Sequence, residues 1–221
     1  PFDALILEPK MEGCILYQQK GKYGLLDEYG NEGVFQPAYD GIEEVLPYIY
    51  AVKINGKWGV THSDDGGIEE PFLPFEYDRV VALPSLPEYI GIYKNSRLGI
   101  VTTDSWQTVL EPSVDKVYDP KLEGWYEWVF FENQGKVGMM EKGTFKTIVP
   151  ATYEKITPIP SSGKVGSLGY VVSQNGKKGF IGVDYKVLIP IIWEDISFDA
   201  NKNELIMKTA TKKEVFHLNQ F

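Results

Sequence analysis

The chain has 221 residues, 43% of them hydrophobic and 24% charged, so it is long enough to bury a core in one or two domains. Its 31 acidic and 22 basic residues give a formal charge of −9, the wrong sign for neutralising phosphates, so we expect no nucleic acid partner. No apolar stretch reaches the length of about 18 residues typical of a membrane span, so we expect no membrane insertion. The single cysteine, Cys14, cannot form an internal disulfide, so it does not indicate whether the protein resides in an oxidising or a reducing compartment. Because the sequence begins with Pro1, we expect that a leader or upstream segment was removed.

A motif of basic residue, any residue and glycine returns five times along the chain. Its glycines are 35, 40, 39 and 41 residues apart, at Gly24, Gly59, Gly99, Gly138 and Gly179. A second signature follows each copy, with a proline and then an acidic residue, as in Pro37 and Asp40. A period of this size indicates a repeat architecture.

Each repeat reads as short β-strands. The runs 50–54 and 57–61 are rich in β-formers and are separated by Asn55-Gly56, the dipeptide that favours a type I′ hairpin turn. Apolar runs before the proline and after the acidic residue, such as 147–149 and 79–83, predict three or four strands per repeat. No window has convincing helical periodicity, so we expect few helices.

The two ends resemble halves of a sixth repeat. Residues 205–218 match the opening half, and residues 2–5 match the closing half. We therefore predict an all-β protein of tandem β-hairpin repeats, forming one repeat domain over residues 1–221. The preferred architecture is a six-bladed propeller-like ring in which the termini share one blade, so that residues 2–5 lie beside residues 214–218. The alternative is an open β-repeat array.

The tandem Gly-Lys-Trp/Tyr-Gly motif, followed by Pro and Tyr-Asp-x-Ile, resembles the WG (KWG) β-repeat family of bacterial proteins over nearly the full chain. Trp58-Gly59 matches the pair that names the family and Tyr23-Gly24 is a mild variant, whereas Leu98, Val137 and Lys178 depart from the aromatic position. The resemblance implies repeated β-structure and an exported bacterial protein. It implies no catalytic residue.

Residues that recur in every repeat are expected to stabilise every repeat rather than to form one active site. We predict that the repeated basic and acidic residues pair within or between adjacent repeats. These residues are Lys22, Lys57, Arg97, Lys136, Lys177 and Lys212 on one side, and Asp3, Asp40, Asp78, Asp115, Glu154 and Glu194 on the other. The repeated glycines are expected to permit close approach of the backbone or a bulge, and the prolines to lie where no amide donor is needed.

Interruptions of the repeat are the better guide to function. Insertions fall between the closing strand of one repeat and the opening strand of the next, at 84–87, 119–124, 158–168 and 199–203. We expect them to share one face, where repeat proteins usually bind their partners. Four aromatic residues lie outside the motif and are candidate binding residues if exposed: Trp106, Trp125, Tyr126 and Trp128. Alternatively, each fills a local gap.

Enzyme and metal signatures are weak. Residues 62–67 offer a histidine and two carboxylates, but their spacing matches no zinc or EF-hand site, and a turn is favoured. With only His62 and His217, a Ser-His-Asp triad is improbable. The sequence leaves open a pair of catalytic carboxylates of the glycosidase type. The candidates for such a pair are acidic residues that do not recur in the repeats, namely Glu69, Glu70, Glu123 and Glu127.

We therefore predict a non-catalytic binding module that uses no cofactor and meets a protein partner through its insertion-bearing face. The expected location is the periplasm or the bacterial cell surface. The alternative is a carbohydrate-binding or glycoside-cleaving protein, which predicts a row of exposed aromatic residues near carboxylates. A third possibility is a spacer within a larger protein.

Overall fold

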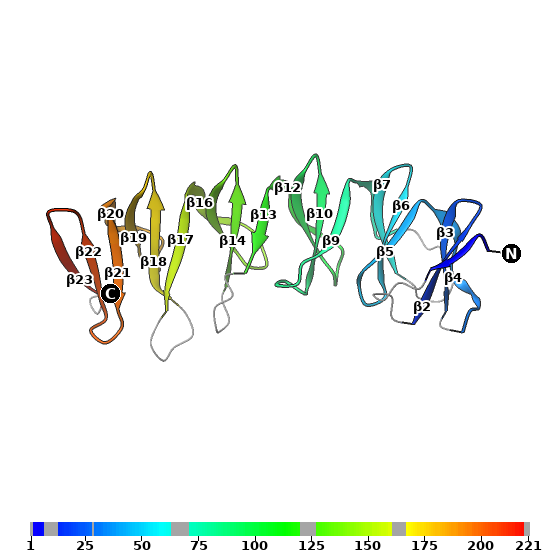
Figure 1. The fold of residues 1–221 in the computed structure, drawn as a ribbon, viewed down its shortest axis with the longest axis horizontal. Helices are drawn as coiled ribbons and strands as arrows, with labels where there is room; N and C mark the ends of the chain where they lie inside the picture. The colour runs from blue at the N-terminus through cyan, green and yellow to red at the C-terminus, as the bar shows by residue number, and fades with distance from the viewer. Residues whose placement is uncertain are drawn as a thin grey trace. The chain divides into compact units, whose positions relative to one another are not determined.

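A computed structural model gives the fold, and the structure describes residues 2–6, 13–27, 29–62, 71–119, 127–160 and 167–218. These residues form six antiparallel sheets and no α-helix, which confirms the predicted all-β class (Figure 1). Five of the sheets have four strands and the sixth has three. The chain divides into two units, residues 1–113 and 114–221. The single repeat domain stays a prediction.

The first unit contains three sheets, numbered one to three in chain order. Sheet one has β1 (Ala4–Ile6), β2 (Cys14–Gln19), β3 (Lys22–Asp27) and β4 (Glu32–Tyr39). Sheet two has β5 (Gly41–Leu46), β6 (Ile49–Ile54), β7 (Lys57–His62) and β8 (Leu73–Tyr77). Sheet three has β9 (Arg79–Ala82), β10 (Tyr89–Lys94), β11 (Arg97–Thr102) and β12 (Thr108–Val114).

The second unit contains sheets four to six. Sheet four has β13 (Lys116–Tyr118), β14 (Trp128–Asn133), β15 (Lys136–Glu141) and β16 (Thr147–Tyr153). Sheet five has β17 (Lys155–Pro160), β18 (Ser167–Gln174), β19 (Lys177–Ile181) and β20 (Val187–Trp193). Sheet six has β21 (Asp195–Asp199), β22 (Glu204–Lys208) and β23 (Lys213–His217).

Every sheet begins directly after one of the repeated acidic residues, so the strand that follows this residue pairs with the next hairpin rather than with the preceding one. The described parts of the insertions therefore lie inside the sheets, between the first and second strands or at the ends of these strands. Residues 84–87, for example, join β9 to β10 of sheet three. The predicted place of this insertion, between the closing strand and the next opening strand, is confirmed. These two strands belong to one sheet, however, because the sequence period does not show where one sheet ends.

The two ends of the chain do not share a sheet among the described residues. Strand β1 pairs with β2, with Leu5 opposite Tyr17, and β23 pairs with β22. Residues 2–5, expected beside residues 214–218, thus supply the first strand of sheet one. The closed ring is not shown, and the open β-repeat array is compatible with these pairings.

The central hairpins have the predicted type I′ turns, in which both central residues have positive φ. In sheet two these residues are Asn55 (φ 52°) and Gly56 (φ 82°). The same conformation occurs at Lys20-Gly21, Asn95-Ser96, Gln134-Gly135 and Asn175-Gly176. All five hairpins with the repeated glycine therefore turn in one way.

The repeated glycines let the fourth strand approach the third. In sheet two, Trp58 lies opposite Tyr77 but Val60 lies opposite Leu73, so β8 carries two extra residues and bulges toward Gly59. A Cβ atom on Gly59 would lie 2.7 Å from the carbonyl oxygen of Leu73. The corresponding distances to a fourth-strand carbonyl oxygen are 2.6–2.8 Å at Gly24, Gly99, Gly138 and Gly179. This confirms the predicted close approach of the backbone.

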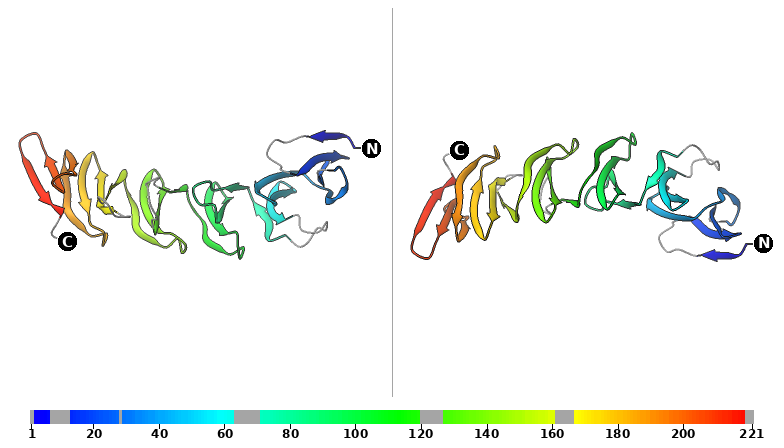
Figure 2. Two further views of the ribbon diagram at one scale, coloured as in Figure 1. Left: turned by 90° about the horizontal axis from the view of Figure 1, so that it is seen from below. Right: turned by 90° about the horizontal axis from the view of Figure 1, so that it is seen from above.

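Within each unit the sheets are stacked face to face (Figure 2). Side chains of neighbouring sheets form shared cores, so the central sheet is buried on both sides. On β6, Tyr50 and Val52 belong to the core shared with sheet one, whereas Ala51 belongs to the core shared with sheet three. All three side chains are 0% exposed. Burial of both faces explains why these strands read as continuous apolar runs rather than as alternating ones. Sheets four to six pack in the same way through two further cores.

Candidate functional site

The repeated acidic residues lie at the edge of each sheet that carries the hairpin turn, which we call the turn edge. The backbone N–H of each acidic residue donates to a carbonyl oxygen on the second strand of the sheet that begins directly after it, at 2.8–2.9 Å. The six donor and acceptor pairs are Asp3 to Gln18, Asp40 to Lys53, Asp78 to Tyr93, Asp115 to Glu132, Glu154 to Ser173 and Glu194 to Lys208. This bond fixes where the next sheet starts.

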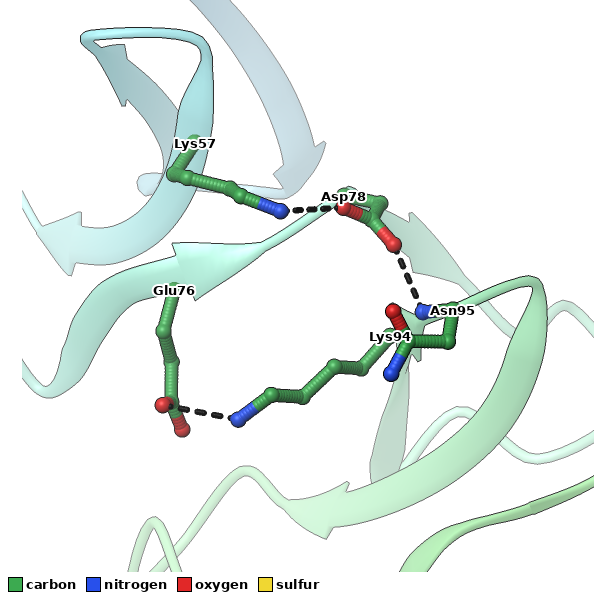
Figure 3. Close-up of polar contacts among 5 residues, drawn as sticks. All are labelled: Lys57, Glu76, Asp78, Lys94 and Asn95. Carbon is green, nitrogen blue, oxygen red and sulfur yellow. Dashed lines mark hydrogen bonds and ion pairs between the residues drawn. The ribbon is translucent and has the colours of Figure 1, made fainter.

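The carboxylate of Asp78 joins two neighbouring sheets of the first unit (Figure 3). Its Oδ1 accepts from Lys57 Nζ in sheet two at 2.5 Å, and its Oδ2 accepts from the backbone N–H of Asn95 in the turn of sheet three at 2.7 Å. Beside this contact, Lys94 Nζ donates to Glu76 Oε2 at 2.9 Å. Asp40 repeats the arrangement between sheets one and two, with Lys22 and the Asn55 N–H. The acidic residue therefore caps the positive-φ turn and links two sheets.

The second unit has the same contacts with variations. Glu154 accepts from the N–H groups of Asn175 and Gly176 and lies 3.6 Å from Lys136 Nζ. Glu194 lies 3.4 Å from Lys177 Nζ. Three further members of the predicted network have other contacts: Arg97 donates to the Ser113 carbonyl, Asp115 accepts from the Gln134 N–H, and Lys212 pairs with Glu214.

These contacts favour the ionised form of three of the repeated carboxylates, those of Asp40, Asp78 and Glu154. Hydrogen bonds from Lys22 and Asn55 lower the pKa of Asp40, and bonds from Lys57 and Asn95 lower the pKa of Asp78. For Glu154 the N–H groups of Gly176 and Asn175 are the main cause of the lowered pKa. A general acid needs the opposite shift. The turn edge is therefore suited to holding sheets together, not to donating protons.

We expect the fold to lose stability in acid because of these carboxylates. A pKa lowered on folding stabilises the protein above the unfolded-state pKa, near 4, and this stabilisation disappears as the pH falls through the lower folded-state pKa. The urea midpoint should therefore fall between about pH 5 and pH 3, and less steeply in Asp78→Asn than in the wild type. The exposed Glu43 of β5 provides a control substitution, Glu43→Gln. If the urea midpoint fell equally steeply with pH in Asp78→Asn and in the wild type, the stabilising role given to the Asp78 carboxylate would be contradicted.

Trp128, a predicted binding residue, is buried. It is 6% exposed in the core between sheets four and five, where its ring lies 5.1 Å from Phe130 and 5.2 Å from Tyr170 between centroids. The prediction of an exposed ligand contact is wrong here, because Trp128 starts the second strand of a sheet that is covered on this face. Trp125 and Tyr126 lie outside the described residues.

Trp106 is half-buried and belongs to a repeated feature that sequence reasoning missed. It has φ 56° in the loop from β11 to β12, packs on the core of sheets two and three, and stacks on Phe72 at 4.5 Å between centroids. Phe145 (φ 52°) and Tyr185 (φ 62°) lie in the equivalent loops of sheets four and five. The sequence feature that could have revealed this repeat is an aromatic residue six or seven positions after the repeated glycine.

The remaining candidate residues lie apart from one another or outside the described residues. No group of three or more potential metal ligands occurs among the described residues. Residues 63–67, Glu69, Glu70 and Glu123 lie outside the described residues, Glu127 is exposed, and His217 Nδ1 lies 3.1 Å from Glu204. The half-buried Cys14 accepts a hydrogen bond from the Tyr50 hydroxyl at 3.5 Å.

An open hollow of about 270 Å³ lies in the second unit, lined by strands β17, β18, β19 and β21. Lys178 occupies the position that Trp58 has in sheet two, and its Nζ donates to Asp195 Oδ1 at 2.6 Å. This bond lowers the pKa of Asp195.

The opposite edge of each sheet, which we call the loop edge, differs in chemistry from the turn edge. In the first unit its described residues include 27, 29–31, 47–48, 83–88 and 103–107. All seven described basic residues of this unit lie at the turn edge: Lys20, Lys22, Lys53, Lys57, Arg79, Lys94 and Arg97. The loop edge carries acidic residues instead, namely Asp27, Glu44, Glu88 and Asp104.

Two tyrosines are strongly exposed at the loop edge of the first unit. Tyr29 is 81% exposed, and Tyr48 is 63% exposed with φ 64°. Their backbone N–H groups donate to Asp27 and Glu44 respectively. Leu86 of the 84–87 insertion is fully buried. The loop edge thus combines anchored segments with exposed aromatic and acidic side chains.

Comparisons with known proteins add the following. No family model matches the chain, and no curated protein matches it. A solved structure of a eukaryotic initiation factor is similar, with 10% identity and a TM-score of 0.41, over 90% of this chain and 59% of that chain. Hsv2 from Kluyveromyces lactis matches with 9% identity and a TM-score of 0.34, over 94% of this chain and 72% of that one. An extracellular domain assigned to a hybrid two component system of B. thetaiotaomicron matches with 9% identity and a TM-score of 0.34, over 32% of its length. None of the described segments is a helix able to span a membrane.

Proposed function

We propose that the chain is a non-catalytic binding module and that the loop edge of its first unit meets a protein partner with a basic surface. The observation that carries this proposal is the separation of charge in that unit, with every described lysine and arginine at the turn edge and four carboxylates at the loop edge. Complementary charge steers a partner and selects its orientation.

The exposed tyrosines supply a second reason. Tyrosine is enriched at protein interfaces, because its ring gives contact area and its hydroxyl a hydrogen bond. Tyr29 and Tyr48 are exposed on the same edge as the carboxylates, while the repeated ion pairs occupy the turn edge. The family resemblance to WG-repeat proteins favours a periplasmic or cell-surface location for this interaction.

The proposal is tested with a fluorescent decapeptide of alternating lysine and glycine, and with a glutamate–glycine peptide of the same length. We expect the lysine peptide to bind the wild type and Asp27→Asn/Glu88→Gln to bind it about tenfold more weakly. The charge-matched control is Asp184→Asn/Asp199→Asn in the second unit, which should bind like the wild type. Circular dichroism checks that each variant is folded.

Two results would contradict the proposal. Equal loss of binding in both charge variants would mean that net charge alone attracts the peptide. Retention of the wild type on immobilised polysaccharide, lost in Tyr29→Ala/Tyr48→Ala but not in the charge variants, would favour the carbohydrate-binding alternative instead.

A further inference from the structure

Among the described residues, sheet six has three strands, whereas each of the other five sheets has four. In sheets one to five, the third strand pairs on one side with the second strand and on the other with a fourth strand that contains the repeated proline. In sheet six, β23 pairs with β22 and with no other described strand. Its outer edge therefore has the backbone groups that accept a fourth strand elsewhere. Such an edge is a template for pairing with another chain.

The residue at the glycine position of β23 is Glu214. In sheets one to five the glycine comes two residues after the repeated basic residue, and Glu214 comes two residues after Lys212. A Cβ atom at each of those glycines would lie 2.6–2.8 Å from a carbonyl oxygen of the fourth strand. Glu214 has that Cβ, so a fourth strand with the same bulge would collide with it.

Glu214 also changes the charge pairing. In four sheets the basic residue pairs with the acidic residue that follows the fourth strand: Lys22 with Asp40, Lys57 with Asp78, Lys136 with Glu154 and Lys177 with Glu194. Lys212, which directly precedes β23, pairs instead with Glu214 of β23. The partner that a fourth strand would bring is thus replaced from within the sheet.

We infer that Glu214 closes the edge of β23 to a fourth strand of the type that completes the other five sheets, whether a peptide or a second copy of this chain supplies that strand. One side chain provides both the steric block and the replacement charge. This protection does not depend on the partner assigned to the loop edge. It resembles the use of charged residues to protect sheet edges in other proteins.

The test uses a fluorescent peptide with the sequence of residues 144–155, which includes β16 and the acidic residue that follows it. Fluorescence anisotropy measures its binding to the wild type, Glu214→Gly, Glu214→Ala and Glu214→Gln. We expect Glu214→Gly to bind the peptide at least about tenfold more tightly than the other three proteins, because only glycine removes the Cβ. Hydrogen exchange should show protection of β23 amides by the peptide in Glu214→Gly alone.

The reverse substitution gives a second test that does not depend on how well Glu214→Gly folds. Gly179→Glu in sheet five should release β20, so its amides exchange faster than those of β17 and β18. The inference is overturned if wild type binds the peptide as tightly as Glu214→Gly. It is equally overturned if Glu214→Gly binds no better than Glu214→Ala, or if β20 stays as protected in Gly179→Glu as in the wild type.

Discussion

Replacing Gly59 by alanine is expected to lower the free energy of unfolding by about 2–3 kcal/mol, near the upper end of the cost of overpacking a core. The new Cβ would lie 2.7 Å from the Leu73 carbonyl oxygen and 3.1 Å from the Phe75 ring. The first atom belongs to the backbone, so it cannot move away by changing a rotamer. Relief requires a shift of β8 in the bulge that contains Pro74.

The matched control is Gly41→Ala, in the same sheet. Its Cβ would meet no atom closer than 3.4 Å, which is an ordinary contact with the Trp58 ring. Loss of a glycine also reduces the entropy of the unfolded chain, so this variant should be neutral or slightly more stable. Urea unfolding followed by circular dichroism compares the two. A Gly59→Ala variant as stable as Gly41→Ala would refute the explanation given for the repeated glycines.

Much of the fold could be predicted because the repeat imposes the same physical problem in each sheet. Asn55-Gly56 specifies a type I′ turn from local backbone preferences alone. The glycine and the acidic residue recur at fixed offsets, and Gly59 and Asp78 each serve one contact that every full sheet needs. Repeated positions of this kind reveal a structural role without any knowledge of which sheet lies next to which.

Other features depend on contacts that the period does not specify. Nothing in the spacing of the motif shows that the strand after Asp78 pairs with the following hairpin. The spacing therefore could not decide between a shared blade, which the described residues do not show, and an open array. Trp106 was set apart because its neighbours differ between repeats, although its loop position and its positive φ recur at Phe145 and Tyr185. The exposed Tyr29 and Tyr48 have no repeated counterpart, and only the structure shows their exposure.

The candidate site follows from this contrast between repeated and unrepeated residues. The repeated charges pair with one another at the turn edge, as Lys57 does with Asp78, so they are engaged in holding sheets together. The charges left at the loop edge of the first unit, such as Glu88 and Asp104, have no described lysine or arginine of that unit on their edge. This contrast is the reason for proposing that recognition uses residues that do not recur in every repeat.

Trp128→Ala should destabilise the protein by about 3–5 kcal/mol, the range for removing a large aromatic side chain from a core. The indole is 6% exposed and makes edge-to-face and tilted contacts with the rings of Tyr170 and Phe130. Tyr170 belongs to sheet five and Trp128 to sheet four, so the lost volume lies where the two sheets pack. Trp128→Phe keeps an aromatic ring in this position, so its free energy of unfolding should fall substantially less.

The exposed aromatic control is Tyr29→Ala, which should change the free energy of unfolding by no more than about 0.5 kcal/mol, because its side chain is 81% exposed. Urea unfolding of the three variants and the wild type provides the measurement. A Trp128→Ala protein with wild-type stability would mean that the indole does not hold sheets four and five together. Trp128 would then again be a candidate binding residue. A large loss in Trp128→Ala with none in Tyr29→Ala would separate the aromatic residue that builds the core from one that is exposed at the loop edge.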